Sequence, residues 1–277
     1  MKSQINYFNI NKFYLGRLFL ALSLLTLFIL DFENSVFNKL TFYLPNATKN
    51  FNLFLLLGYE NLFYSKLFSI IILTMVVLNI LPKIISIFHW WVSFSFFHSA
   101  YLVEGGDQIS MIITFLLIPI CFYNIQYNKS LSFSSNFPYI VNIIELLIIF
   151  QISSLYFHAF IGKLAVKEWT DGTACFYWLT NETFGLPNSI ISFIKPVLHN
   201  RFIILILTWG TLLIELVLAL GFLFKQEIKN YIFVIGVVFH FLIWIFHGLG
   251  NFMLAMDAAL ILYLLPKNIK IPIYVYR

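Results

Sequence analysis

The sequence has few charged residues, only two cysteines and none of the common catalytic or nucleotide-binding motifs. Charged residues make up 10% of the 277-residue chain, whereas apolar residues make up 61% and aromatic residues 19%. A soluble domain of this length cannot bury so large an apolar share in one core. The composition therefore excludes a soluble domain and predicts a protein that crosses a membrane several times.

Several kinds of site are missing from the sequence. It contains no Gly-rich phosphate loop, no His/Cys spacing typical of a metal site and no Gly-x-Ser-x-Gly elbow. Lys and Arg residues are scattered over short loops instead of forming a basic stripe, so the net charge of +5 reflects membrane orientation. We expect the lipid bilayer as a partner, with no metal and no nucleic acid.

The apolar runs are continuous and do not alternate in polarity, which favours helices over a β-barrel. The predicted fold class is all-α: a transmembrane helical bundle of about eight spans, each of roughly 20 residues or somewhat fewer. No repeat or long linker divides the chain, so residues 1–277 are predicted to form a single domain. The predicted spans are 13–30, 67–88, 89–103, 109–123, 139–162, 202–224, 231–249 and 251–265.

Charge orients this arrangement when the loops are assigned alternately to the two sides of the membrane. By the positive-inside rule both termini are cytoplasmic, the segments 31–66 and 163–201 face outward, and the protein is a multi-pass protein of the cell membrane. The basic residues on the inner side are Lys2, Lys12, Lys83, Lys129, Lys225, Lys229, Lys267, Lys270 and Arg277, with Glu227 as an acid among them. The outer side carries Asp31, Glu33, Glu60, Glu104, Asp107, Glu168, Asp171 and Glu182.

The two cysteines, Cys121 and Cys175, fall on opposite sides in this topology, so we expect no disulfide between them. Cys175 is either an unreactive thiol packed among aromatic residues or a redox thiol.

Charged residues inside apolar spans cost free energy unless they are paired or hydrated. Arg17, Glu145 and Glu215 all fall in the cytoplasmic half of their spans. We expect them to neutralise one another, with Glu215 as the partner of Arg17, in a buried ion pair that holds helices together. A catalytic role for one of them is the alternative.

A second polar set lies toward the outer half of the spans: His158, Lys163, His240, His247 and Asp257. A single histidine in a membrane helix usually makes an interhelical hydrogen bond, but several at one depth favour a site. His240 and His247 are not spaced as a zinc pair on one helix, which needs three or four residues. Lys163 is either an anchor that lifts its ammonium to water or a base.

The order of motifs resembles the HTTM family of transmembrane proteins, which includes the vitamin K-dependent γ-glutamyl carboxylase. The most specific block runs from Tyr156 to Ala174. Within that family, the length and the opening helix look like the bacterial sporulation-delaying protein B type, which assists maturation of an exported antimicrobial peptide. The residues that carry the resemblance are Trp91 through Gly105-Gly106-Asp107-Gln108 to Pro119, Tyr156-Phe157, Lys163-Leu164, Trp169, Asp171-Gly172-Thr173-Ala174, Thr208-Trp209, Glu215-Leu216, His240, Gly248-Leu249 and Phe252.

The resemblance implies that Lys163 is the base that deprotonates a reduced quinone, which then acts on the substrate. That chemistry needs a neutral amine, which desolvation at a helix end can supply. His240 is expected to share the catalytic site by orienting substrate or sharing a proton. Residues expected to bind substrate are Trp169, Asp171, Gly172, His158, His247 and Asp257.

The sequence also departs from the carboxylase. No large β-rich domain follows the last span before Arg277, and the spacing from Lys163 to Trp169 is one residue longer, so we do not predict glutamate carboxylation. We predict a membrane protein that assists maturation of an exported peptide at an outward-facing site, with the peptide precursor and a second maturation protein as partners; the resemblance implies quinol-dependent chemistry at that site. The alternatives are a peptide export accessory or proton-coupled carrier with Glu145, Glu215 and Asp257 as relays, and a non-catalytic immunity or scaffold protein.

Overall fold

The computed structural model of the protein describes residues 3–30, 35–43, 46–122 and 137–276. Most of these residues are helical, as the predicted helical bundle requires. Five residues of the charge pattern lie outside the described part of the chain: Lys2, Asp31, Glu33, Lys129 and Arg277.

The first half of the chain forms four long helices. Pro82 occupies the first turn of the third of them, where a missing N–H costs nothing. The chain turns just before it, with Asn79 and Leu81 at positive φ. The predicted boundary between spans 67–88 and 89–103 is therefore wrong, because the turn precedes Pro82. The four helices are α1 (Lys12–Leu30), α4 (Leu62–Val77), α5 (Pro82–Ser99) and α6 (Gly105–Phe122).

The second half contributes four more long helices. Gly248 ends the third of these at φ 73°, a left-handed conformation that glycine adopts without strain, and the chain reverses there. The helices are α7 (Phe137–Leu164), α11 (Arg201–Ala219), α12 (Gln226–His247) and α13 (Gly250–Leu264).

Short helices fill the two segments that were predicted to face outward. Segment 31–66 holds α2 (Lys39–Tyr43), α3 (Leu53–Leu57) and the 3-10 helix η1 (Tyr59–Asn61) ahead of the first turn of α4. Segment 163–201 holds α8 (Lys167–Thr170), α9 (Ala174–Leu179) and α10 (Asn188–Leu198). A further 3-10 helix, η2 (Gly221–Leu223), joins α11 to α12.

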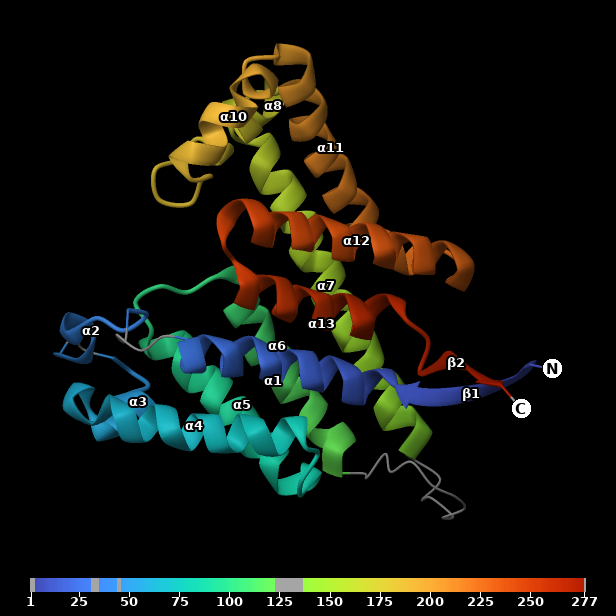
Figure 1. Cartoon of the computed structure of the whole chain (residues 1–277). Coiled ribbons are helices and arrows are strands. Elements are labelled where there is room, and N and C mark those ends of the chain that lie inside the picture. The colour runs from blue at the N-terminus through green and yellow to red at the C-terminus, as the bar shows by residue number, and fades with distance from the viewer. Residues whose placement is uncertain (1–2, 31–34, 44–45, 123–136, 277) are drawn as a thin grey trace.

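The two ends of the chain pair as a two-stranded antiparallel ribbon, which the all-α prediction missed. Strand β1 (Ser3–Asn11) runs beside β2 (Asn268–Tyr276), with Ser3 opposite Tyr276 and Asn11 opposite Asn268. Figure 1 shows that this pairing places both termini at the same end of the molecule. The side of the membrane that this end faces stays a prediction.

Six helices in the described chain are long and apolar enough to cross a membrane, fewer than the eight expected. They are α1, the continuous helical stretch 59–77, α6, residues 139–164 of α7, α11 and α12. Of the two other predicted spans, α13 is an apolar helix of 15 residues, and α5 is outside this set. The protein is therefore a multi-pass helical membrane protein.

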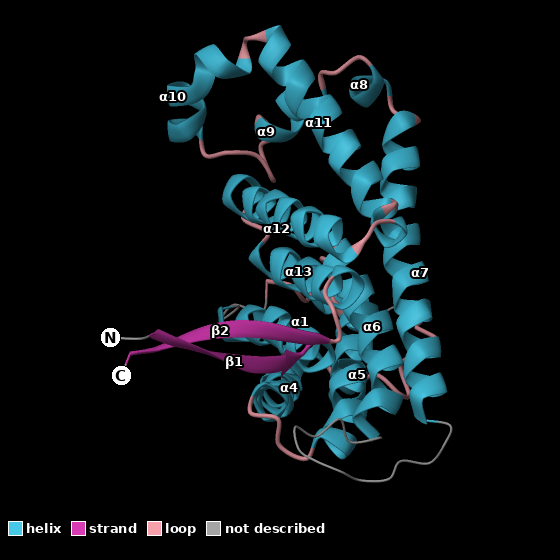
Figure 2. Ribbon diagram, turned by 90° about the vertical axis from the view of Figure 1, so that its right-hand side faces the viewer, coloured by secondary structure: helices cyan, strands magenta, loops and turns pink. Residues whose placement is uncertain are grey.

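The helices do not all run in one direction. Figure 1 shows α12, α13, α1 and α4 one above the other, while α7 crosses this stack. Figure 2 shows α7 along one side of the molecule, and α7 contacts α6, α11 and α13. Short helices α8 to α10 lie beyond α12, next to the end of α7 and the start of α11.

Two apolar clusters share α1 as a common wall. One cluster packs the first part of α1, around Leu20, against α6, α7, α12 and α13. The other packs the later part of α1, around Leu24 and Phe28, against α3, α4 and α5, with phenylalanine rings in edge contacts. Because α1 belongs to both clusters, it joins the two halves of the bundle.

Candidate functional site

A cavity of about 910 Å³ lies where α7, α11, α12 and α13 meet the short helices α8 and α9. The start of α6 completes its wall. Five of the residues predicted for the site line this cavity: Lys163, His240, Trp169, His158 and His247. The structure thus brings together residues from α7, α12 and the short helix α8.

Lys163, in the last turn of α7, forms an ion pair across the cavity wall. Its Nζ atom lies 2.7 Å from Oε1 of Glu215 on α11 and 5.3 Å from the ring centre of Trp169. The Lys163 side chain is 26% exposed, and that of Glu215 is 8% exposed. Lys163 therefore points toward a buried carboxylate, which fixes the position of its side chain.

The predicted pairing of Glu215 with Arg17 is wrong. Glu215 bonds to Lys163, whereas Arg17 lies within hydrogen-bonding reach of Cys121 on α6. The three charges do not neutralise one another, because Glu145 also has different partners. The apolar pattern indicates only roughly how deep these three charged residues lie in the bilayer. It does not specify which helix faces which.

The second carboxylate oxygen of Glu215 is buried and has no hydrogen-bond partner in the described part of the chain. A buried acceptor without a donor is costly, and it is usually explained by water, an ion or a ligand. Since Glu215 lines the cavity, a molecule bound there can supply the missing donor.

His240, which is 1% exposed, lies in a chain of three polar side chains. Its Nε2 atom is 3.2 Å from the hydroxyl of Tyr156 on α7, and its Nδ1 atom is 3.3 Å from Oδ1 of Asp257 on α13. Because Nδ1 faces a carboxylate, we assign the proton to Nδ1, so that Nε2 accepts from the Tyr156 hydroxyl. Asp257 fixes the tautomer of His240 from behind the wall and does not line the cavity itself.

His158 and His247 each use one ring nitrogen to contact a backbone carbonyl. Nδ1 of His158 is 2.8 Å from the carbonyl of Ser154, and Nδ1 of His247 is 2.7 Å from that of Phe184. Both rings therefore have a fixed orientation at the cavity wall, and both are candidates for substrate binding there.

Asp171 and Gly172 shape the loop after α8 and lie outside the cavity wall. The Oδ1 atom of Asp171 accepts hydrogen bonds from the backbone N–H and the hydroxyl of Thr173. Gly172 has φ 82°, and a Cβ atom there would come within 2.8 Å of Leu205. The structure brings this pair near the site as loop-forming residues, without a place on the wall for binding substrate.

Two known proteins are similar to the chain. The Sporulation-delaying protein SdpB of Bacillus subtilis (strain 168) is 34% identical over 206 residues, which cover 71% of this chain and 62% of SdpB. The uncharacterized protein YitO of the same organism is 33% identical over 230 residues, which cover 80% of this chain and 74% of YitO. The chain belongs to the SdpB-like family.

The resemblance to the wider HTTM family is not shown, because no protein-family model matches the chain. No solved structure matches it either. The aligned region spans less than two thirds of SdpB. The comparisons therefore establish an SdpB-like membrane protein and leave its chemistry to be argued from the cavity.

Among the cavity residues of this SdpB-like protein that were not predicted as site residues are Glu104 and Tyr156. Glu104 lies just before α6, and burial, with a smaller effect of Asp107, raises the pKa of its carboxyl to about 7. Tyr156 is 2% exposed and bonds to His240. The sequence does place Glu104 between an apolar run and Gly105-Gly106, and an acid in such a position is a signal that could have found it.

Cys175, at the start of α9, also lines the cavity, and both cysteines are free thiols. Burial raises the pKa of the Cys175 thiol, and its backbone N–H donates to the hydroxyl of Thr208. A raised pKa reduces the thiolate fraction, which favours the interpretation of Cys175 as an unreactive packed residue. Within the described residues, no group of three or more His, Cys, Asp or Glu side chains could hold a metal ion.

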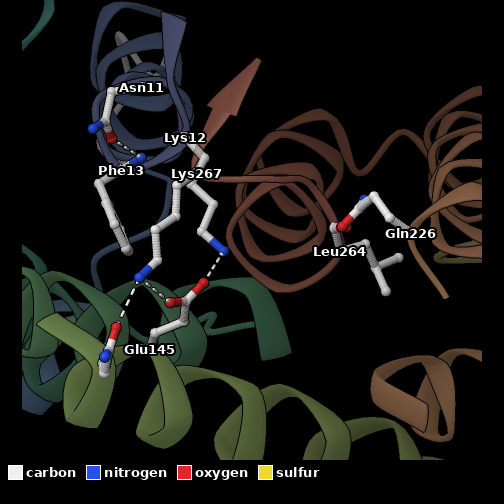
Figure 3. A network of polar contacts seen from close by, with 8 residues as sticks. Asn11, Lys12, Phe13, Glu145, Gln226, Leu264 and Lys267 are labelled. Atoms are coloured by element: carbon white, nitrogen blue, oxygen red, sulfur yellow. Dashed lines mark hydrogen bonds and ion pairs between the residues drawn. The ribbon is translucent and has the colours of Figure 1, made fainter. Parts of the chain in front are cut away.

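Glu145 lies outside the cavity, in a network at the other end of α7 (Figure 3). Its two oxygens contact Nζ of Lys12 at 2.6 Å and Nζ of Lys267 at 3.0 Å. Lys267 also donates to Oδ1 of Asn142, and the backbone N–H of Lys12 donates to the carbonyl of Lys267. We name Lys12, Glu145 and Lys267 the terminal clamp, because it joins the start of α1 and the chain entering β2 to α7.

Proposed function

We propose that this SdpB-like protein assists the maturation of an exported antimicrobial peptide, and that the peptide is processed at the cavity beside Lys163. The similarity to a protein named for sporulation delay supports the pathway, and the six candidate spans support action at a membrane. The partners proposed are the peptide precursor and a second maturation protein.

The observation that carries the proposal is the half-satisfied pair of Lys163 and Glu215 on the cavity wall. Lys163 acts as the base in two steps: its ammonium first gives a proton to the carboxylate of Glu215, and the neutral amine then takes a proton from the bound molecule. After the second step Lys163 is an ammonium again, and its charge stabilises the anion formed on the bound molecule. Lys163 and Glu215 therefore form one proton-transfer unit.

His240 presents a second polar group to the same space. Its ring is stacked at 15° to the ring of Tyr156 and held edge-on to Phe252. With Asp257 fixing the ring from the other side, His240 keeps one orientation and can position a substrate carbonyl or share a proton. This gives His240 a positioning role beside the proton-transfer unit.

The cavity fits a reduced quinone in size and in lining. Aromatic and apolar side chains make up most of its wall, and a volume of about 910 Å³ lies in the range of small-molecule sites. The open oxygen of Glu215 would accept a hydrogen bond from a quinol hydroxyl, and Trp169 and Phe252 would pack against its ring. When bound, a reduced quinone would supply a strong base only after Lys163 has deprotonated it and molecular oxygen has oxidised it.

The proposal is tested by comparing secreted peptides from cells that lack this gene and from cells complemented with it. Mass spectrometry of the medium should show at least one peptide that disappears or changes mass without the gene and returns with the wild type. Lys163→Arg should accumulate normally in the membrane yet fail to restore that peptide, because arginine keeps the positive charge but cannot become a neutral base. The loss should be on the order of 100-fold or more.

Two outcomes would overturn the proposal. An unchanged set of secreted peptides in the deletion strain would remove peptide maturation. Full restoration by Lys163→Arg would remove Lys163 as a base and leave export or scaffolding as the better account.

A further inference from the structure

Two carboxylates with an unused oxygen line the same cavity. Oε2 of Glu104 and Oε2 of Glu215 are both buried without a hydrogen-bond partner among the residues that the structure describes. Glu215 is only 6% exposed, so water reaches it poorly. Other buried side-chain atoms without a partner, on residues such as Arg17 and His89, do not line this cavity.

The position of Glu104 is fixed by its own backbone. Its N–H donates to Oδ2 of Asp107 at 2.8 Å, and its carbonyl accepts from the N–H of Asp107, so the residue caps the start of α6. Because these bonds use only the backbone of Glu104, its carboxyl takes no part in the cap. Burial, with a smaller effect of Asp107, raises the pKa of the Glu104 carboxyl to about 7.

The charges on the cavity wall leave one carboxylate unmatched. Glu104 and Glu215 are its acids, and Lys163, which is bonded to Glu215, is the basic residue that lines it. The histidines of the wall already direct one nitrogen each to a protein acceptor or donor, as described above. A ligand that satisfies these open oxygens therefore has to bring hydrogen-bond donors and positive charge.

The wall also offers aromatic faces suited to a cation. Trp178, Phe239 and Phe252 line it together with Trp169, over which the ammonium of Lys163 lies at 5.3 Å. Aromatic rings attract ammonium groups most strongly where water is excluded. The cavity therefore already holds one ammonium between a carboxylate and an indole ring.

We propose that the cavity binds a second ammonium group, supplied by the peptide substrate, at the open carboxylate oxygen of Glu104. An ammonium has three donors, enough to bond to this oxygen and still rest on an aromatic face such as that of Phe252, which lies beside Gly105. The proposal rests on the proposed function for the identity of the ligand as a peptide. It adds that the peptide is recognised by an amine, either its amino terminus or a lysine side chain.

Three small probes test this with the purified full-length protein in lipid nanodiscs. L-phenylalaninamide carries an α-ammonium, Nα-acetyl-L-lysinamide carries a side-chain ammonium, and Nα-acetyl-L-phenylalaninamide carries neither. Binding is measured by the change in tryptophan fluorescence, since Trp169 and Trp178 line the cavity. We expect at least one amine probe to bind about tenfold or more tightly than the acetylated control, and that probe identifies the source of the ammonium.

The matched variants are Glu104→Gln and Glu60→Gln. Glutamine keeps the shape of Glu104 but removes its charge, so binding of the amine probe should weaken about tenfold. Glu60 is an exposed acid paired with Lys39 outside the cavity, and its variant should bind like the wild type. Folding of both variants is checked by their melting temperatures and by gel filtration.

The inference would be overturned if neither amine probe bound more tightly than Nα-acetyl-L-phenylalaninamide. It would also be overturned if Glu104→Gln bound the amine probe as tightly as the wild type does. The secreted-peptide assay separates this failure from failure of the proposed function. Peptide maturation that needs Lys163 but is unaffected by Glu104→Gln contradicts the ammonium site alone. Amine binding that needs Glu104, in a protein whose deletion changes no secreted peptide, contradicts the maturation role alone.

Discussion

Helix α7 carries a charged residue near each end, and each forms a lysine–glutamate pair in a different setting. In the terminal clamp, both oxygens of Glu145 are bonded to lysines, and the side chain of Lys12 is 3% exposed. In the cavity, Glu215 has one lysine partner and one open oxygen. The same two residue types thus form a saturated site and a half-satisfied site.

The difference teaches that burial of an ion pair does not by itself identify a functional site. A saturated buried pair has no capacity left for a ligand, and its role is to hold elements together. The clamp joins two distant ends of the chain to α7, whereas the cavity pair leaves one buried carboxylate oxygen without a partner beside a cavity of about 910 Å³. We therefore assign a structural role to the terminal clamp and a chemical role to the pair of Lys163 and Glu215.

The most decisive test asks whether the two sites face opposite sides of the membrane. In a variant without Cys121 and Cys175, single cysteines are introduced at Glu182, beyond α9, and at Lys225, before α12. Because the loop charges place segment 163–201 outside, a membrane-impermeant maleimide should label the cysteine at position 182 in intact cells and not the one at 225. Labelling at 225 alone would reverse the orientation and place the cavity loops in the cytoplasm.

A second test exchanges the two acids for their amides. Glu215→Gln should lower production of the mature peptide per folded molecule by about tenfold or more, since it removes half of the proton-transfer unit. Because Glu215 pairs with Lys163 and not with Arg17, this replaces the expectation that Glu215 serves mainly to hold helices together. Glu145→Gln should retain most of its activity per folded molecule, and an inactive but well-folded Glu145→Gln would contradict the division of roles.

The free energy of unfolding should respond in the opposite order to activity, with the larger loss in Glu145→Gln. Glu145→Gln leaves two lysines without a counter-charge, one of them buried, and should lower the free energy of unfolding by about 3 kcal/mol. The exposed pair of Lys39 and Glu60 provides the matched control, because Glu60→Gln should cost less than about 1 kcal/mol. Chemical denaturation in mild detergent measures both, and equal losses would show that the clamp adds no more than a surface pair.

The smallest expected effect is the pH dependence of stability that Glu104 contributes. Its pKa is about 7 in the folded protein and 4.5 in the ordinary case, so between these values the folded state binds more protons than the unfolded state. The free energy of unfolding from this group therefore falls as pH rises through that window. The difference in melting temperature, Glu104→Gln minus wild type, should accordingly become more positive as the pH rises from about 5 to about 8.

Other titratable groups lie around Glu104 and also contribute to the pH dependence of stability. Subtracting the melting temperature of the wild type from that of Glu104→Gln isolates the contribution of Glu104. A difference in melting temperature that stays constant with pH would show that the carboxyl of Glu104 does not titrate in this window. The groups concerned are Asp107 of α6, His158 and Lys163 of α7, Glu215 of α11, and His240 and His247 of α12.

Several predictions depended on local patterns. Continuous apolar runs predicted the helices around Arg17, Glu145 and Glu215, and the positions of Lys163 and His240 on different helices at similar depth predicted a shared site. The structure does place Lys163 and His240 on one cavity wall. Their chemical roles stay predictions.

The sequence by itself determined that this is a helical membrane protein, because apolar composition and run length are properties of short stretches of chain. Only the tertiary structure decided that Glu215 faces Lys163 and not Arg17, that Glu104 lines the cavity, and that the two ends of the chain form a ribbon. These contacts join residues from 52 to more than 200 positions apart. They depend on how each helix is rotated and packed, which a hydrophobic pattern does not specify when most faces of a helix are apolar.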